Sequence, residues 1–110
     1  MVIVETSIFT RIIQELLNDD DYAEFQIALS QRPDMGDLIP GSGGLRKVRW
    51  RISSKGKRGG LRVIYYWLTQ EAQILKLYAY TKSRQEDLSK SQLAALREIA
   101  ERWEDGKKDV

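Results

Sequence analysis

The stretch that decides the fold reads Leu45-Arg-Lys-Val-Arg-Trp-Arg-Ile-Ser-Ser-Lys-Gly-Lys-Arg-Gly-Gly-Leu-Arg62, and it carries eight basic residues from Arg46 to Arg62 with no acidic one. Its first part alternates strictly between cationic and apolar side chains: Lys47, Arg49 and Arg51 against Val48, Trp50 and Ile52. Successive side chains of a β-strand point to opposite faces, so the alternation predicts a strand with one apolar face and one row of cations. Cations in a row repel one another, which favours a polyanion lying across that face.

Composition sets the class of protein. With 110 residues, 42% of them apolar, the chain is expected to form a single domain, residues 1–110, around one core. No apolar run approaches the length of a membrane span and the N-terminus lacks the pattern of a signal peptide, so we expect a cytoplasmic protein without membrane contact. The sequence contains no cysteine and no histidine. Thiol chemistry, histidine-based catalysis and a typical zinc site are therefore excluded, and no metal or other cofactor is expected.

Charge is segregated along the chain. Residues 1–45 carry 8 acidic and 2 basic side chains, residues 46–82 carry 1 and 10, and residues 83–110 carry 7 and 6, for a net charge of only +2. The cations gathered in the middle segment point to an anionic partner more strongly than the net charge does.

Hydrophobic periodicity predicts four strands and three helices. The strands fall at residues 1–5, 45–52, 61–68 and 74–81, and the helices at residues 7–17, 19–32 and from a capping box at Ser89 to Gly106, before a flexible tail at about 105–110. This order predicts an α+β fold, in which two N-terminal helices and one C-terminal helix pack on one face of an antiparallel sheet of three to four strands. The pattern leaves the partner of the first strand open.

Three neighbouring strands are predicted to share one exposed face, which collects the side chains of Lys47, Arg49, Arg51, Arg62, Tyr78, Tyr80 and Lys82. In the strand at 74–81, alternation also assigns Lys76 to this face. Cations suit phosphates and tyrosine rings suit stacking on bases, so the pattern favours a nucleic-acid ligand. The alternatives are an ordinary solvated face for the cations and simple strand propensity for Tyr78 and Tyr80.

Three motifs carry a resemblance to a known family: Gly-Gly-Leu-Arg-Lys-Val-Arg at 43–49, Gly-Lys-Arg-Gly-Gly-Leu-Arg-Val-Ile-Tyr-Tyr at 56–66, and Leu-Tyr-Ala-Tyr-Thr-Lys-Ser at 77–83. With these motifs the chain resembles RelE-superfamily toxins, closest to the HigB branch of type II toxin–antitoxin systems. The resemblance covers the order of elements across essentially the whole chain. It implies a RelE-like fold, ribosome-dependent cleavage of mRNA in the decoding site of the small subunit, inhibition of translation, and a helix-turn-helix antitoxin of the HigA type as partner.

The resemblance also implies roles for particular residues. By motif position, four basic residues are expected to be catalytic: Lys47, Arg49, Arg62 and Lys82. RelE toxins carry a further arginine and a late tyrosine, and these two positions hold Ser83 and either Leu88 or Ser89 here. Tyr80 or Lys82 is expected to take their place. Further RNA-binding residues are expected around them: Arg46, Arg51, Lys55, Lys57, Arg58 and Tyr78. The hairpin that carries Lys55, Lys57 and Arg58 is either a phosphate clamp or a solvated turn.

RNA supplies its own nucleophile, the 2′-hydroxyl, so cleavage needs groups that move protons and stabilise the phosphate but needs no metal. Arg62 and Arg49 are expected to hold the phosphate. Crowding by cations is expected to lower the pKa of Lys47, Lys82 or Tyr80 toward neutrality, so that one of them exchanges protons. The alternative function is a non-catalytic RNA- or ribosome-binding module that uses the same face.

Overall fold

The computed structural model describes residues 1–51 and 60–108, and the side chains of residues 1–51 and 60–106. Its elements follow one another as β1 (Val2–Glu5), α1 (Ser7–Leu16), α2 (Asp19–Gln31), β2 (Asp37–Leu38), β3 (Leu45–Trp50), β4 (Leu61–Leu68), the short 3₁₀ helix η1 (Thr69–Glu71), β5 (Gln73–Thr81) and α3 (Lys90–Lys108). The predicted α+β class is confirmed. No helix among the described residues has the length and apolarity that crossing a bilayer requires.

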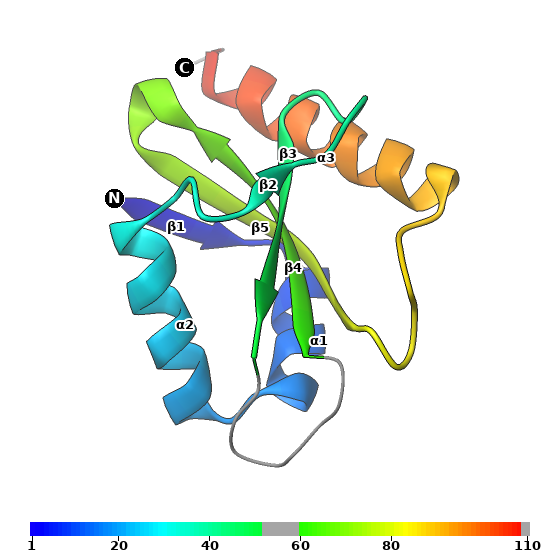
Figure 1. Ribbon diagram of the computed structural model, residues 1–110. Coiled ribbons are helices and arrows are strands. Elements are labelled where there is room, and N and C mark those ends of the chain that lie inside the picture. Colours follow the sequence, from blue (N-terminus) through cyan, green and yellow to red (C-terminus); the bar gives the residue numbers. More distant parts are fainter. Residues whose placement is uncertain (52–59, 109–110) are drawn as a thin grey trace.

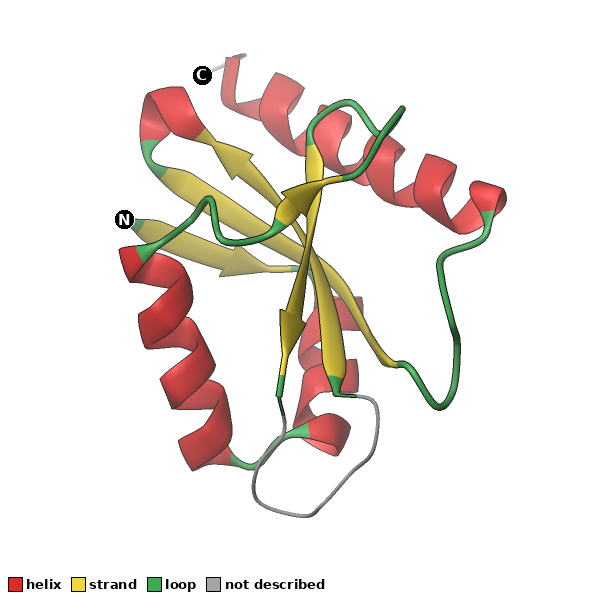
Figure 2. Cartoon of the chain, in the orientation of Figure 1, coloured by secondary structure: helices red, strands yellow, loops and turns green. Residues whose placement is uncertain are grey.

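The strands form one twisted sheet in the order β1-β5-β4-β3-β2 (Figures 1 and 2). β2, β3, β4 and β5 pair antiparallel, and β1 pairs parallel to β5 with Val2 opposite Gln73. The sheet therefore has one strand more than predicted, because two residues of the loop at 33–44 pair with β3 as β2. The parallel pairing gives β1 the partner that its sequence left open.

Helices cover both faces of the sheet, so the prediction that all three pack on one face is wrong. α1 and α2 bury their apolar residues against one face, which Val48, Val63 and Ile74 represent, whereas α3 packs against Leu45, Ile64 and Leu75 on the other face. Figure 1 shows α3 on the opposite side of the sheet from α2. β4 is apolar at every position except Arg62, which is typical of a strand with both faces buried.

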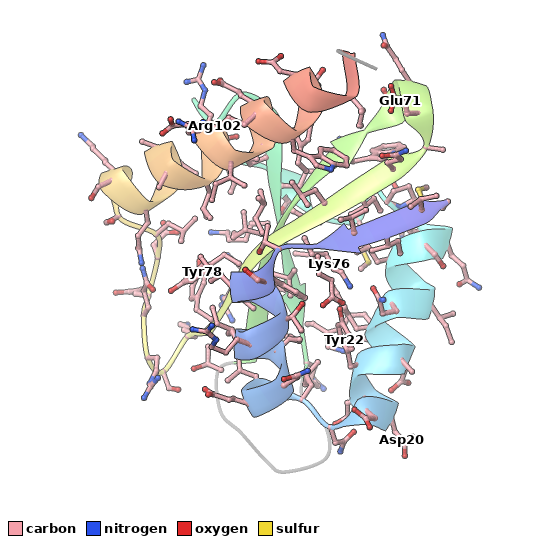
Figure 3. All side chains as sticks on the ribbon, turned by 180° about the vertical axis from the view of Figure 1, so that it is seen from behind. Asp20, Tyr22, Glu71, Lys76, Tyr78 and Arg102 are labelled. Carbon is pink, nitrogen blue, oxygen red and sulfur yellow. The ribbon has the colours of Figure 1, made fainter. Side chains whose placement is uncertain are left out.

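A β-bulge divides β5. The register to β4 shifts between Ile64, opposite Tyr78, and Tyr65, opposite Lys76, so Leu77 is the extra residue. A bulge reverses the alternation of side chains beyond it. Lys76 therefore lies on the α1/α2 face and is fully buried, while Tyr78 and Tyr80 lie with Leu77 on the α3 face. The predicted placement of Lys76 beside the tyrosines is wrong (Figure 3).

Side-chain caps begin the helices where the sequence indicated. Thr6 Oγ1 accepts the amide of Phe9 at 3.1 Å, and Asn18 Oδ1 accepts that of Asp21 at 2.8 Å. Ser89 and Gln92 form the predicted capping box, with their side chains accepting each other's amides at 3.1 and 2.9 Å. The predicted helix end at Gly106 is wrong, because α3 runs on to Lys108. Glycine weakens a helix but does not end it unless its backbone turns left-handed.

Candidate functional site

Two cross-strand rows of side chains lie on the α3 face of the sheet. In the first row, Arg49 of β3 lies opposite Arg62 of β4, and Arg62 lies opposite Tyr80 of β5. In the second row, Lys47 lies opposite Ile64, and Ile64 lies opposite Tyr78. Directly opposed residues of antiparallel strands share a face at side-chain contact distance. The sheet therefore brings five predicted residues together in a surface that we call the basic face: Lys47, Arg49, Arg62, Tyr78 and Tyr80.

Like charges meet across the first row of the basic face. Arg49 is exposed and Arg62 is half-buried, and two guanidinium groups on directly opposed positions lower the stability of a sheet. A local arrangement that costs stability is most often found at a functional site. The row has the two charges and the fork geometry that a phosphate group accepts.

Tyr80 lies beneath the basic face with 5% of its surface exposed. Its hydroxyl is buried and has no hydrogen-bond partner among the described residues. Burial raises the pKa of Tyr80, the charge of Asp87 raises it further, and Arg62 and Arg49 only partly offset them. The predicted lowering of this pKa by crowded cations is therefore wrong, because desolvation outweighs them. Tyr80 stays protonated and is a hydrogen-bond donor rather than a base.

Tyr78 forms the border of the basic face toward α1 and α3. Its ring centre lies 6.0 Å from that of Tyr80, with an angle of 35° between the rings. Beside it is an apolar hollow of about 170 Å³, lined by Ile8, Leu77, Tyr78, Gln92, Ala95, Leu96 and Ile99. A half-buried ring next to an apolar hollow is suited to stacking against a flat apolar group.

One carboxylate reaches the basic face, and the sequence analysis missed it. Asp87 lies in the loop at 82–89 that joins β5 to α3 (Figure 1, yellow), and its Oδ1 is 3.4 Å from Lys47 Nζ. The amide of Leu88 donates to the same oxygen at 2.9 Å. This hydrogen bond and the charges of Lys47 and Arg49 lower the pKa of Asp87 against a small opposing effect of burial. The alternation of side chains that places residues in strands does not extend into loops. The only sequence signal for Asp87 was that an acidic residue follows a strand of the basic segment.

Other predicted residues lie apart from the basic face. Arg46 is on the α1/α2 face, where its Nη1 donates to the Gly36 carbonyl at 2.7 Å and its guanidinium lies 5.7 Å from the Trp67 ring centre. Arg51 is exposed just beyond β3. Lys82 is exposed just beyond β5, and its amide donates to the Gly60 carbonyl at 3.4 Å. Lys55, Lys57 and Arg58 lie outside the described residues.

Metal ligands are not gathered anywhere in the part of the chain that the structure describes: it contains no group of three or more His, Cys, Asp or Glu side chains placed to hold an ion. The ionisable groups of the basic face are two arginines, a lysine and two tyrosines, and the carboxylate of Asp87 lies beside them.

Comparison with known proteins places this fold in a family. A chain in the crystal structure of the intact E. coli RelBE toxin–antitoxin complex superposes with a TM-score of 0.54 at 9% sequence identity, covering 73% of this chain and 94% of that chain. At that identity the match shows a common fold. The family model described as the RelE toxin of the RelE/RelB toxin–antitoxin system matches residues 1–109. The chain therefore belongs to the RelE toxin family.

Proposed function

We propose that this toxin is a ribosome-dependent endoribonuclease that cleaves mRNA through the 2′-hydroxyl and so inhibits translation. Membership of the RelE family gives the class of protein, and the basic face gives a site for the reaction. The single observation that carries the proposal is the row Arg49–Arg62–Tyr80, two cations and a phenol on three adjacent strands.

The row offers what a phosphate in a strained, highly charged transition state requires. Arg49 and Arg62 bind the non-bridging oxygens and offset the charge that develops on them. The protonated hydroxyl of Tyr80 adds a neutral donor from below. Tyr78 stacks on a base next to the bond that is cut, and the apolar hollow beside it accepts part of that base. Lys47 of the second row provides an ammonium group beside this arrangement, and Lys82 stays a predicted site residue that lies apart from it.

The ribosome has a defined part in this proposal. Arg49 of the basic face is exposed, so this side chain positions a flexible RNA strand poorly by itself. Fixing the reacting groups in line removes a large part of the barrier of such a reaction. An mRNA held in the decoding site arrives in that geometry, so we expect little cleavage of free RNA.

The same proposal includes the antitoxin partner of this toxin, its branch of the RelE superfamily and its location in the cell. We propose a HigB-type toxin of the cytoplasm, neutralised by a helix-turn-helix antitoxin of the HigA type. The segregated acidic and basic segments of the toxin give such an antitoxin two surfaces of opposite charge to recognise. Co-expression with the product of the neighbouring gene, followed by purification of a complex, tests this part.

The activity is tested with translating ribosomes. Wild-type protein is incubated with them, the mRNA 5′ ends are mapped, and the 5′-hydroxyl ends and 2′,3′-cyclic or 3′-phosphate ends are identified chemically. Discrete cuts that disappear with Arg62→Ala and with free mRNA support the proposal. A protected footprint without cuts identifies a non-catalytic ribosome-binding module on the same face, and undiminished cutting by Arg62→Ala removes the row from the site.

A further inference from the structure

We propose that Asp87 is the general base of the cleavage reaction and that Lys47, with which it is paired, is the general acid. This inference rests on the proposed endoribonuclease function and assigns its two proton-transfer steps. It starts from the position of Asp87, whose Oδ1 is 3.4 Å from Lys47 Nζ at the edge of the row that binds the phosphate.

The loop at 82–89 holds Asp87 in place. Gln85 Nε2 donates to the Asp87 carbonyl at 2.8 Å and also to Gln92 Oε1 of α3. Gln92 Oε1 in turn accepts the amide of Ser89 at 2.9 Å as half of the capping box. The first turn of α3 thus fixes the loop on both sides of Asp87. The carboxylate is also held directly, because its Oδ1 accepts the Leu88 amide.

The surroundings of Asp87 keep this carboxylate ionised, which is the state that a base needs. Asp87 faces Lys47 and Arg49 of β3 and Tyr80 of β5, and with its pKa lowered it is ionised at neutral pH. Lys47 donates a hydrogen bond to the same carboxylate. An ionised carboxylate accepts the proton of a hydroxyl that comes within hydrogen-bond reach of it. The chain contains no histidine, the usual general base of such reactions, and a carboxylate takes that role in this proposal.

The step balances as follows. Asp87 takes the proton of the 2′-hydroxyl, the 2′-oxygen forms a bond to phosphorus, and the bond from phosphorus to the 5′-oxygen breaks. The 5′-oxygen takes a proton from the Lys47 ammonium, so the products are a 2′,3′-cyclic phosphate and a 5′-hydroxyl. The carboxylic acid and the neutral amine left behind then exchange one proton and restore the ion pair.

Base and acid act at opposite ends of an in-line displacement, so the scissile phosphate enters between Asp87 and Lys47. Their contact can open for it. The Asp87 side chain is 71% exposed and the N–O distance of 3.4 Å is long, and exposed ion pairs of this kind contribute little to stability.

The test separates base from acid with a synthetic mRNA in which sulfur replaces the 5′-oxygen at the mapped cut. A thiolate leaves without a proton, so loss of the acid no longer matters on this substrate, whereas loss of the base still does. On the normal mRNA in ribosome complexes we expect Asp87→Asn and Lys47→Met each to slow cleavage about 10²–10⁴-fold. On the sulfur substrate Lys47→Met recovers most of its rate, and Asp87→Asn stays slow. The residual rate of Asp87→Asn rises with pH, because solvent hydroxide replaces the base.

Glu86→Gln is the matched control, since it removes the neighbouring exposed carboxylate of the same loop and is expected to stay within about threefold of wild type. Asn and Ser at position 87 both keep an acceptor for the Leu88 amide, so thermal unfolding and the rate of Asp87→Ser separate lost chemistry from lost structure. Wild-type rates in a folded Asp87→Asn or Asp87→Ser variant overturn the inference, and faster cleavage identifies Asp87 as a group that blocks the site. Absence of cleavage by the wild type overturns the proposed function instead.

Discussion

Glu5 Oε2 lies 3.0 Å from Lys76 Nζ, and this pair joins the edge strand β1 to β5 beneath α2. Lys76 is fully buried and also donates to Tyr22 and Gln26 of α2, while the Tyr22 hydroxyl donates to Glu5. Figure 3 shows Lys76 and Tyr22 pointing toward each other between the sheet and the helix. One buried ammonium therefore connects three elements that are far apart in the sequence.

Removing the negative charge of this pair is expected to destabilise the fold strongly. Glu5→Gln leaves the buried ammonium of Lys76 without its counter-ion, which costs about 3 kcal/mol of unfolding free energy. Glu15→Gln removes an exposed carboxylate of α1 that has no such partner among the described residues, and it is expected to stay within about 0.5 kcal/mol of wild type. Urea denaturation measures both, and equal midpoints for the two variants would show that the pair contributes nothing.

The same carboxylate gives the fold a pH dependence of known sign. Burial alone would raise the pKa of Glu5, but hydrogen bonds from Thr10, Tyr22 and Lys76 outweigh it and lower the pKa below the ordinary value of 4.5. The contribution of Glu5 to stability is therefore complete above that value and is lost as the pH falls through the folded-state pKa.

We accordingly expect the stability difference between wild type and Glu5→Gln to be constant near neutral pH and to shrink as the pH falls below the ordinary carboxyl value of 4.5. Urea titrations from acidic to neutral pH measure it, with Glu15→Gln as the reference for general acid effects. A difference that persists undiminished at the lowest pH where wild type still folds contradicts the lowered pKa.

Tyr80→Phe is expected to separate stability from activity. The buried hydroxyl has no partner among the described residues, and removing such a group saves its desolvation, so the variant should be as stable as wild type or about 1 kcal/mol more stable. Cleavage on ribosomes should nevertheless fall about tenfold or more, because the donor to the phosphate is gone. A less stable variant that keeps full activity would assign the hydroxyl to the fold alone.

Gly36 is expected to tolerate no side chain. A Cβ there would lie 2.9 Å from both the hydroxyl and a ring carbon of Tyr65, whose hydroxyl accepts the Gly36 amide, and 3.1 Å from the backbone of Lys47. Gly36→Ala should therefore cost about 1–3 kcal/mol. Gly106→Ala meets no atom within 4 Å inside α3 and should stabilise by about 0.5–1 kcal/mol. Thermal unfolding compares them, and a neutral Gly36→Ala would mean that Tyr65 can move.

Regular strands were the part of the site that sequence could predict. β3 and β4 pair without a break, so the parity of Arg49 and Arg62 was enough to place them side by side. The bulge at Leu77 has no signature in the pattern of residues, and it moved Lys76 from the predicted exposed face into the core. The continuous apolar run of β4 did contain the signal that both faces are covered, but alternation alone could not reveal it.

Loop residues were the part that sequence could not predict. Asp87 reaches the basic face only because its loop is tied to the first turn of α3, and no periodicity describes such a path. The predicted direction of the Tyr80 pKa shift was wrong for a related reason. A sequence shows how many cations lie nearby, but it does not show that the hydroxyl is buried away from water.

The extra residue in β5, Leu77, puts two neighbouring side chains, Leu77 and Tyr78, on the same face of the sheet. On either side of this pair the side chains still alternate between the two faces: Ile74 and Ala79 lie in the core under α1 and α2, and Leu75 and Tyr80 lie on the α3 face. Deleting that one residue would restore an unbroken ladder and would leave Lys76 opposite Tyr65 and Tyr78 opposite Ile64, each on its present face. The strand therefore accommodates one additional residue at this point without changing which side chains either half presents to each face.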